Sequence, residues 1–167
     1  MSATFKRRVT GGGLAALMLL SGSAAVQAVT TIKVTVTIVA PPPCVINGDS
    51  LIEVDFGNEV LTTRIDGESY KKQAINYTVE CKDAPSNAMK LQIQGNGAGF
   101  NSDVLQTSKG DLGIKLLRNG NSLPLNEWIN FTYPTLPRLE AVPIKKAGAT
   151  LAGGAFSAGA TMKVEYQ

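Results

Sequence analysis

Apolar and polar residues alternate with a period of two along most of the chain after position 29. This alternation is typical of β-strands with one buried face, whereas an amphipathic helix repeats its apolar residues every three or four positions. The alternating runs are residues 32–38, 52–56, 75–81, 89–93, 112–116 and 156–166. Turn sequences separate them: Asn47-Gly48-Asp49, Gly57-Asn58, Asp66-Gly67, Gly95-Asn96-Gly97, Asn119-Gly120 and Gly153-Gly154. The pattern predicts an all-β chain folded as a sandwich of two antiparallel sheets, with residues 120–150 the least clear.

The first alternating run stands apart from the others. Its apolar positions are Ile32, Val34, Val36 and Ile38, and Pro41-Pro42-Pro43 separates it from the rest of the chain. Three prolines hold the backbone extended and cannot donate to a strand ladder. Residues 29–40 are therefore either the first strand of the chain's own sheet or a strand that completes the sheet of another molecule.

The first 28 residues have the pattern of an export signal. Lys6, Arg7 and Arg8 precede the apolar run 14–20, and small residues follow up to Ala28, where we expect cleavage; a cut after Ala25 is the alternative. The apolar run is far shorter than the roughly 20 residues that cross a bilayer. The three cations also account for the whole formal charge of +3, so no nucleic-acid partner is expected.

The cysteine and histidine content limits the chemistry. The chain has no histidine, which excludes Ser-His and Cys-His nucleophiles and most zinc sites. Cys44 and Cys81 are the only cysteines, and in an oxidising compartment we expect them to form one structural disulfide, with two free thiols as the alternative. No metal and no cofactor is expected.

Three further patterns could indicate a site, and we interpret each as structural. Ser69-Tyr70-Lys71-Lys72 has the spacing of a lysine-activated serine, but that site needs a helix and partner motifs that the chain lacks. The glycine-rich run 95–99 precedes no helix and is expected to be a turn. Trp128, Phe131 and Tyr133 could stack on a sugar, although we expect them in the core. The sequence therefore does not predict an enzyme.

Several motifs together resemble the subunits of chaperone–usher fimbriae (pili). The motifs are Pro41-Pro42-Pro43-Cys44-Val45-Ile46-Asn47-Gly48, the strand Ile52-Glu53-Val54-Asp55-Phe56-Gly57-Asn58, Cys81 at the end of an alternating strand, Leu112-Gly113-Ile114-Lys115-Leu116, and the C-terminal strand 154–167 with Tyr166 in the penultimate position. Each motif is common by itself, but their order and spacing cover essentially the whole chain after the signal. The region from the prolines to Asn58 looks closer to minor or adaptor subunits than to the major shaft subunit.

The resemblance implies a fold and a mechanism. It implies an incomplete immunoglobulin-like sandwich that lacks its last strand, in a domain of residues 44–167. A periplasmic chaperone fills the open groove first. At the outer-membrane usher, the N-terminal extension of the next subunit replaces the chaperone by donor-strand exchange. The product is a cell-surface fimbrium that supports bacterial adhesion.

The same resemblance assigns residues to roles. The extension is residues 29–43, and its donor residues are Ile32, Val34, Val36 and Ile38. The acceptor groove is expected along the last strand, at Phe156, Ala160, Met162, Val164 and Tyr166. The main-chain carboxylate at Gln167 is expected to meet basic residues of the chaperone. Many such extensions have glycine where this chain has Val36, which leaves the neighbour in the fibre open. The alternatives are a tip adhesin and a secreted carbohydrate-binding sandwich.

Overall fold

The computed structural model describes residues 43–167, which form strands joined by loops and two short 3-10 turns. The expected signal segment and the expected donor residues lie outside the described residues. The strands are β1 (Val45–Ile46), β2 (Gln73–Ile75), β3 (Val79–Glu80), β4 (Ala88–Gln94), β5 (Gly97–Ala98), β6 (Asn101–Gln106), β7 (Leu112–Arg118), β8 (Asn121–Leu123), β9 (Trp128–Thr132), β10 (Leu139–Lys145) and β11 (Thr161–Tyr166). The 3-10 turns are η1 (Asn47–Asp49) and η2 (Thr62–Arg64).

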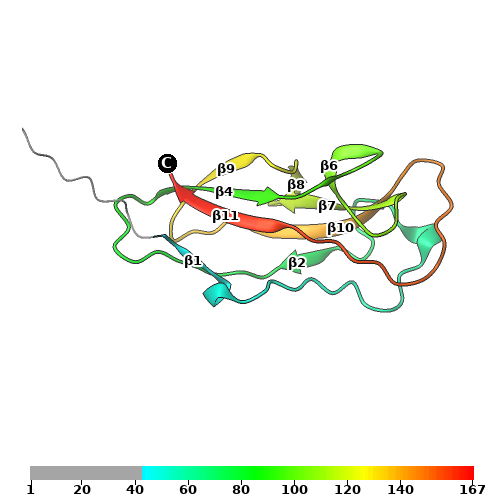
Figure 1. Cartoon of the computed structure of the whole chain (residues 1–167), viewed down its shortest axis with the longest axis horizontal. Helices are drawn as coiled ribbons and strands as arrows, with labels where there is room; N and C mark the ends of the chain where they lie inside the picture. Colours follow the sequence, from blue (N-terminus) through cyan, green and yellow to red (C-terminus); the bar gives the residue numbers. More distant parts are fainter. Residues whose placement is uncertain (1–42) are drawn as a thin grey trace, which may run out of the picture. The chain divides into compact units, whose positions relative to one another are not determined.

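The strands form two main sheets and one small pair (Figure 1). The larger sheet has the order β2-β10-β7-β6-β5, with β8 beside β7, and the smaller sheet has the order β11-β4-β9. β1 pairs with β3, and every pairing is antiparallel. The fold is thus the expected all-β, immunoglobulin-like sandwich, and its sheets do not close on each other.

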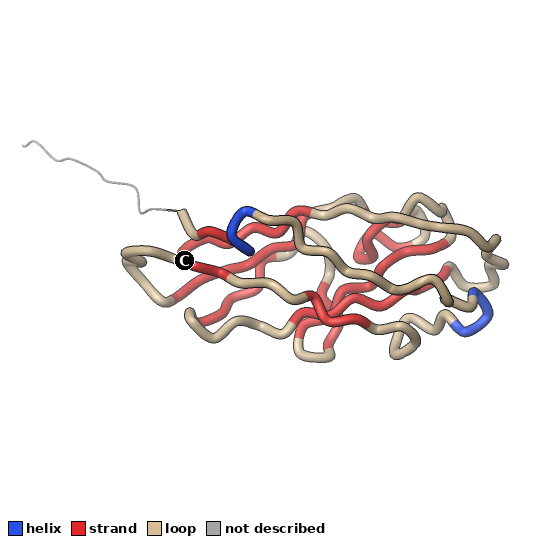
Figure 2. Tube along the Cα trace, turned by 90° about the horizontal axis from the view of Figure 1, so that it is seen from below, coloured by secondary structure: helices blue, strands red, loops and turns tan. Residues whose placement is uncertain are grey.

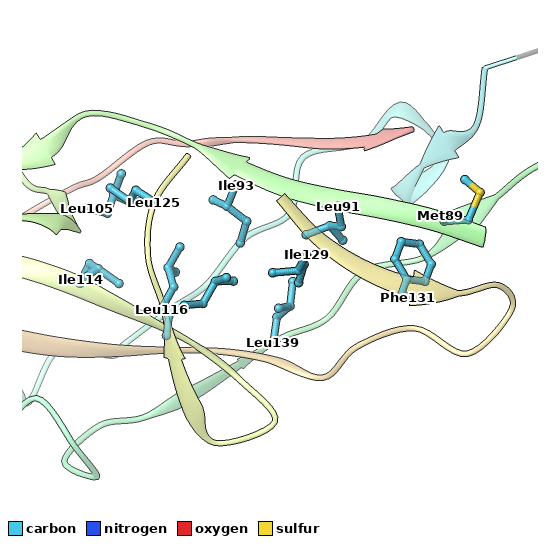
Figure 3. Close-up of a cluster of buried hydrophobic side chains, with 12 residues drawn as sticks. Met89, Leu91, Ile93, Leu105, Ile114, Leu116, Leu125, Ile129, Phe131 and Leu139 are labelled. Carbon is cyan, nitrogen blue, oxygen red and sulfur yellow. The ribbon is translucent and has the colours of Figure 1, made fainter. Parts of the chain in front are cut away.

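The core lies between the two main sheets, as the alternation requires. β4 is the clearest case, because Met89, Leu91 and Ile93 are buried while the residues between them are not. Figure 3 shows these side chains together with those that face them across the sandwich. The buried cluster is Met89, Leu91, Ile93, Leu105, Ile114, Leu116, Leu123, Leu125, Ile129, Phe131, Leu139 and Ala141. Burying an aliphatic side chain contributes about 1.5–3 kcal/mol, so this cluster is the main stabilising contribution.

Some predicted strands differ in the structure. The predicted strand 75–81 is interrupted, since β2 ends at Ile75 and β3 begins at Val79. Residues 52–56 pair with no strand, and the predicted last strand begins at Thr161 instead of residue 156. Figure 2 shows how much of the chain is loop (tan) beside the strands (red).

Tyr77 lies in the interruption between β2 and β3. Its hydroxyl donates a hydrogen bond of 2.7 Å to the carbonyl oxygen of Pro137, so this residue ties the break to the loop before β10. Burial raises the pKa of Tyr77 to about 12, because the phenolate would lose its solvation there.

This contact gives a pH-dependent prediction. Tyr77→Phe should lower the free energy of unfolding by about 1 kcal/mol at neutral pH, since the Pro137 carbonyl loses its donor. The folded pKa of about 12 exceeds the ordinary tyrosine value, so the folded chain holds this proton more tightly than the unfolded chain does. The advantage of the unsubstituted chain is complete below pH of about 10 and is lost as the pH rises toward the folded pKa. Urea unfolding of both chains across this range tests the prediction, and a constant difference between them would contradict it.

Candidate functional site

An open groove of about 560 Å³ lies between the sheets in the described part of the chain. Its floor is apolar and consists of core residues from both sheets: Ile75, Ile93, Leu105, Ile114, Leu116 and Ala141. In Figure 1 the two walls are the cyan segment after η1 and the red end of the chain that includes β11. A groove whose floor is the core itself marks a place where the sandwich is incomplete.

The first wall is the segment from residue 51 to residue 56. Ile52, Val54 and Phe56 are half-buried, while the residues that alternate with them are exposed, so the segment has the side-chain pattern of a strand. It nevertheless pairs with no other strand in the described residues. An extended segment without a partner leaves its backbone N–H and C=O groups available for a strand ladder.

The second wall runs from Phe156 into β11. β11 pairs with β4 on one side only, so it is an edge strand whose other side faces the groove. Before β11, Ala158 forms an isolated bridge with Thr107, and Ser157 exchanges backbone and side-chain hydrogen bonds with Ser108 at 2.8 and 3.1 Å. This wall is thus held by one sheet at its start and by the other along β11.

The rings of Phe56 and Phe156 bring the two walls together at one end of the groove. Their centroids are 6.0 Å apart, at an interplanar angle of 34°. Aromatic pairs at this separation contribute about 0.5–1.5 kcal/mol beyond the area they bury. The contact therefore links the two walls directly.

The expected acceptor residues occupy two different positions. Phe156, Ala160 and Met162 line the groove. Val164 and Tyr166 lie further along β11, where they pack half-buried against the core cluster beyond the lined stretch. The sequence interpretation did not include the first wall or the floor, although the alternation at Ile52, Val54 and Phe56 was the signal for that wall.

The disulfide between Cys44 and Cys81 is present, which confirms the expected pairing. It links the residue before β1 to the residue after β3. The Tyr166 hydroxyl lies 3.6 Å from Cys44 Sγ, so the far end of β11 packs beside the bridge. The disulfide therefore supports one end of the groove-forming strand.

The serine–lysine pattern serves a structural purpose. Ser69 Oγ donates to Asp66 Oδ2 at 2.9 Å, and Lys72 Nζ lies 4.0 Å from Glu140 Oε1. Asp66 also accepts backbone N–H bonds from Glu68, Ser69 and Tyr70, and these bonds lower the pKa of its carboxyl. Ser69 is thus hydrogen-bonded to one carboxylate within a tight loop, and Lys72 is ion-paired with another.

The aromatic cluster considered for sugar binding is divided between two faces. Phe131 is buried, as expected, but Trp128 is 38% exposed, so its placement in the core was wrong. In β9 these two residues have opposite parity and point to opposite faces of the sheet. Lys90 Nζ lies 4.6 Å from the centroid of the Trp128 ring, which provides a cation–π contact. The residues do not form one aromatic platform.

Comparison with known proteins identifies the fold and the family. The family model described as "Fimbrial protein" matches residues 31–167. The fimbrial-like protein YfcR of Escherichia coli K12 is 38% identical, over 95% of this chain and 94% of its own length. The solved structure of the P pilus adaptor subunit PapF is similar, with 25% identity, a TM-score of 0.57, and coverage of 77% of this chain and 98% of that chain.

The P pilus rod subunit PapA shares the fold, with a TM-score of 0.62 at 23% identity over 75% of this chain and all of that chain. Within the part that the structure describes, we find no helix of the length and hydropathy needed to cross a membrane. The two pilus structures have the same fold as the sandwich found here, and the family model and the relative show the family. This chain belongs to the fimbrial protein family and is a subunit of the chaperone–usher pilus type.

Proposed function

We propose that this subunit polymerises by donor-strand exchange, in which residues 29–40 enter the groove of a neighbouring subunit. The observation that supports the proposal is the groove itself, whose apolar floor of core residues lies between an edge strand and an unpaired extended segment. An inserted strand would have backbone partners on both walls. The fibre so formed would support bacterial adhesion.

The donor segment has the side-chain pattern that such a groove requires. Ile32, Val34, Val36 and Ile38 have the same parity, so in an extended strand they share one face. Each would cover apolar floor residues and contribute about 1.5–3 kcal/mol. The acceptor surface would include Phe156, Ala160 and Met162. The far end of β11 would be held in place by Val164 and Tyr166.

The proposal includes a route of assembly. Residues 1–28 direct export and are removed, residues 29–43 form the extension, and residues 44–167 form the acceptor domain. In the periplasm a chaperone covers the groove, and the outer-membrane usher then exchanges the chaperone for the next subunit. The adaptor subunit PapF, at 25% identity, supports a minor or adaptor position in the fibre.

A pair of lysine substitutions tests strand exchange. We expect the mature chain, residues 29–167, to form polymers, and Val34→Lys to keep it monomeric because the charge would have to enter an apolar groove. Thr35→Lys is the matched control, since this residue has the opposite parity and would face solvent. Sedimentation velocity measures the size of each form. Equal polymerisation of the two variants would overturn the proposal.

A further inference from the structure

The charges that line the groove are all of one sign. Of the residues that line it, only Glu53 and Asp55 carry charge. Both are exposed and alternate with the half-buried Ile52, Val54 and Phe56, so they form the rim of the first wall. Asp55 Oδ1 accepts a 2.7 Å bond from the Gly57 backbone N–H, which holds this carboxylate in position.

The second wall has a different charge pattern. On β11 the exposed residues between the inward-facing ones are Thr161, Lys163 and Glu165. Glu165 Oε2 lies 3.1 Å from Lys90 Nζ, so its charge is already paired, and Lys163 supplies a positive charge along this edge. A cation on the outer face of an inserted strand would therefore be attracted to the first wall and repelled from Lys163 on the second.

The donor segment has one charged residue of the complementary sign. Lys33 is the only charged residue among positions 29–40, and it alternates with Ile32 and Val34. If those two residues enter the groove, Lys33 is on the face that remains at the rim. An acid at the same position would instead meet two carboxylates.

We propose that Glu53 and Asp55 select a donor strand with a cation at position 33, so that the groove prefers the extension of a second copy of this chain over an acidic extension. The inference rests on strand exchange as the function of the groove and names the feature by which the groove recognises its partner. Charges at the rim of an interface act mainly on the rate of association, and their effect falls with ionic strength. The selection should therefore appear in the rate of capture.

Capture of synthetic peptides by the full mature chain tests this selection. The acceptor is the Val34→Lys chain, which should not donate its own strand, and the probes are fluorescent peptides of residues 29–40 with the native sequence, Lys33→Glu or Val34→Lys. We expect the Lys33→Glu peptide to be captured about tenfold more slowly than the native peptide at low salt. The difference should shrink at about 0.5 M salt. Fluorescence anisotropy gives the rates.

A charge-reversed acceptor makes the test specific. Glu53→Lys with Asp55→Asn changes the rim but keeps an acceptor oxygen for the Gly57 N–H, and this acceptor should capture the Lys33→Glu peptide faster than the native one. Equal rates for the two peptides, or an unchanged preference in the reversed acceptor, would overturn the charge selection and leave strand exchange intact. If the native peptide is captured no better than the Val34→Lys peptide, strand exchange itself fails and the selection fails with it.

Discussion

A donor strand supplied in the same chain should raise the melting temperature of the domain by tens of degrees. The change is to remove residues 29–40 and to attach a copy of them after Gln167 through a flexible linker. Four aliphatic side chains would cover the apolar floor of the groove, each worth about 1.5–3 kcal/mol before the cost of ordering the strand. A net gain of several kcal/mol corresponds to roughly 20 °C or more in a domain of this size. Circular dichroism and calorimetry give the melting temperatures.

Two other forms of the chain make this result interpretable. The form without residues 29–40 and without the added strand should melt early or aggregate, because its groove stays open. A form whose added strand carries Val34→Lys should resemble it, which separates insertion of the strand from the mere presence of a longer tail. The expectation is wrong if the mature chain is already a stable monomer and loses its fold when residues 29–40 are removed. That outcome would make the segment the first strand of its own sheet.

The sequence predicted those strands that pair with other strands inside the described domain. The runs 89–93 and 112–116 became β4 and β7, because alternating apolar residues there are buried between two sheets. The Asn119-Gly120 turn is also present, with positive φ at both residues and a hairpin that pairs Arg118 with Asn121. In these places local pattern and tertiary contacts agree.

Other strands were unclear from the sequence because they contain residues that are usually excluded from central strands. β10 contains Pro143, which usually argues against a central strand. Pro143 pairs with Ile114 of β7, but β2 reaches β10 only at residues 139–141, so on its other side the proline has no strand that needs its missing N–H. No rule of periodicity reveals that β2 ends there.

The groove could be predicted only in part for a similar reason. The strand pattern of Ile52, Val54 and Phe56 was visible, and so was that of Phe156, Ala160 and Met162. Which strands pair, and which two face each other across a gap, depends on contacts between distant parts of the chain. The sequence therefore indicated one wall through a resemblance, whereas the structure shows both walls and the core residues that form the floor.

Removal of the disulfide should cause the second large change in stability. Replacing Cys44 and Cys81 with alanine opens a link between residues 37 positions apart, and the chain-entropy estimate for such a loop is roughly 3–4 kcal/mol. The substitution should lower the melting temperature by about 10–15 °C in the form with the added donor strand, where unfolding is expected to be cooperative.

The position of the disulfide also predicts which part of the domain loses stability first. Because the Tyr166 hydroxyl lies 3.6 Å from Cys44 Sγ, the end of β11 should lose protection first, and amide hydrogen exchange in β11 should rise more than in β7. Reduction of the unsubstituted chain with dithiothreitol is the matched control and should give the same loss of stability, whereas the alanine variant should not respond to the reductant. A variant as stable as the oxidised chain would show that the bridge adds nothing to folding. Uniform exchange in β7 and β11 would show that it does not support the wall of the groove.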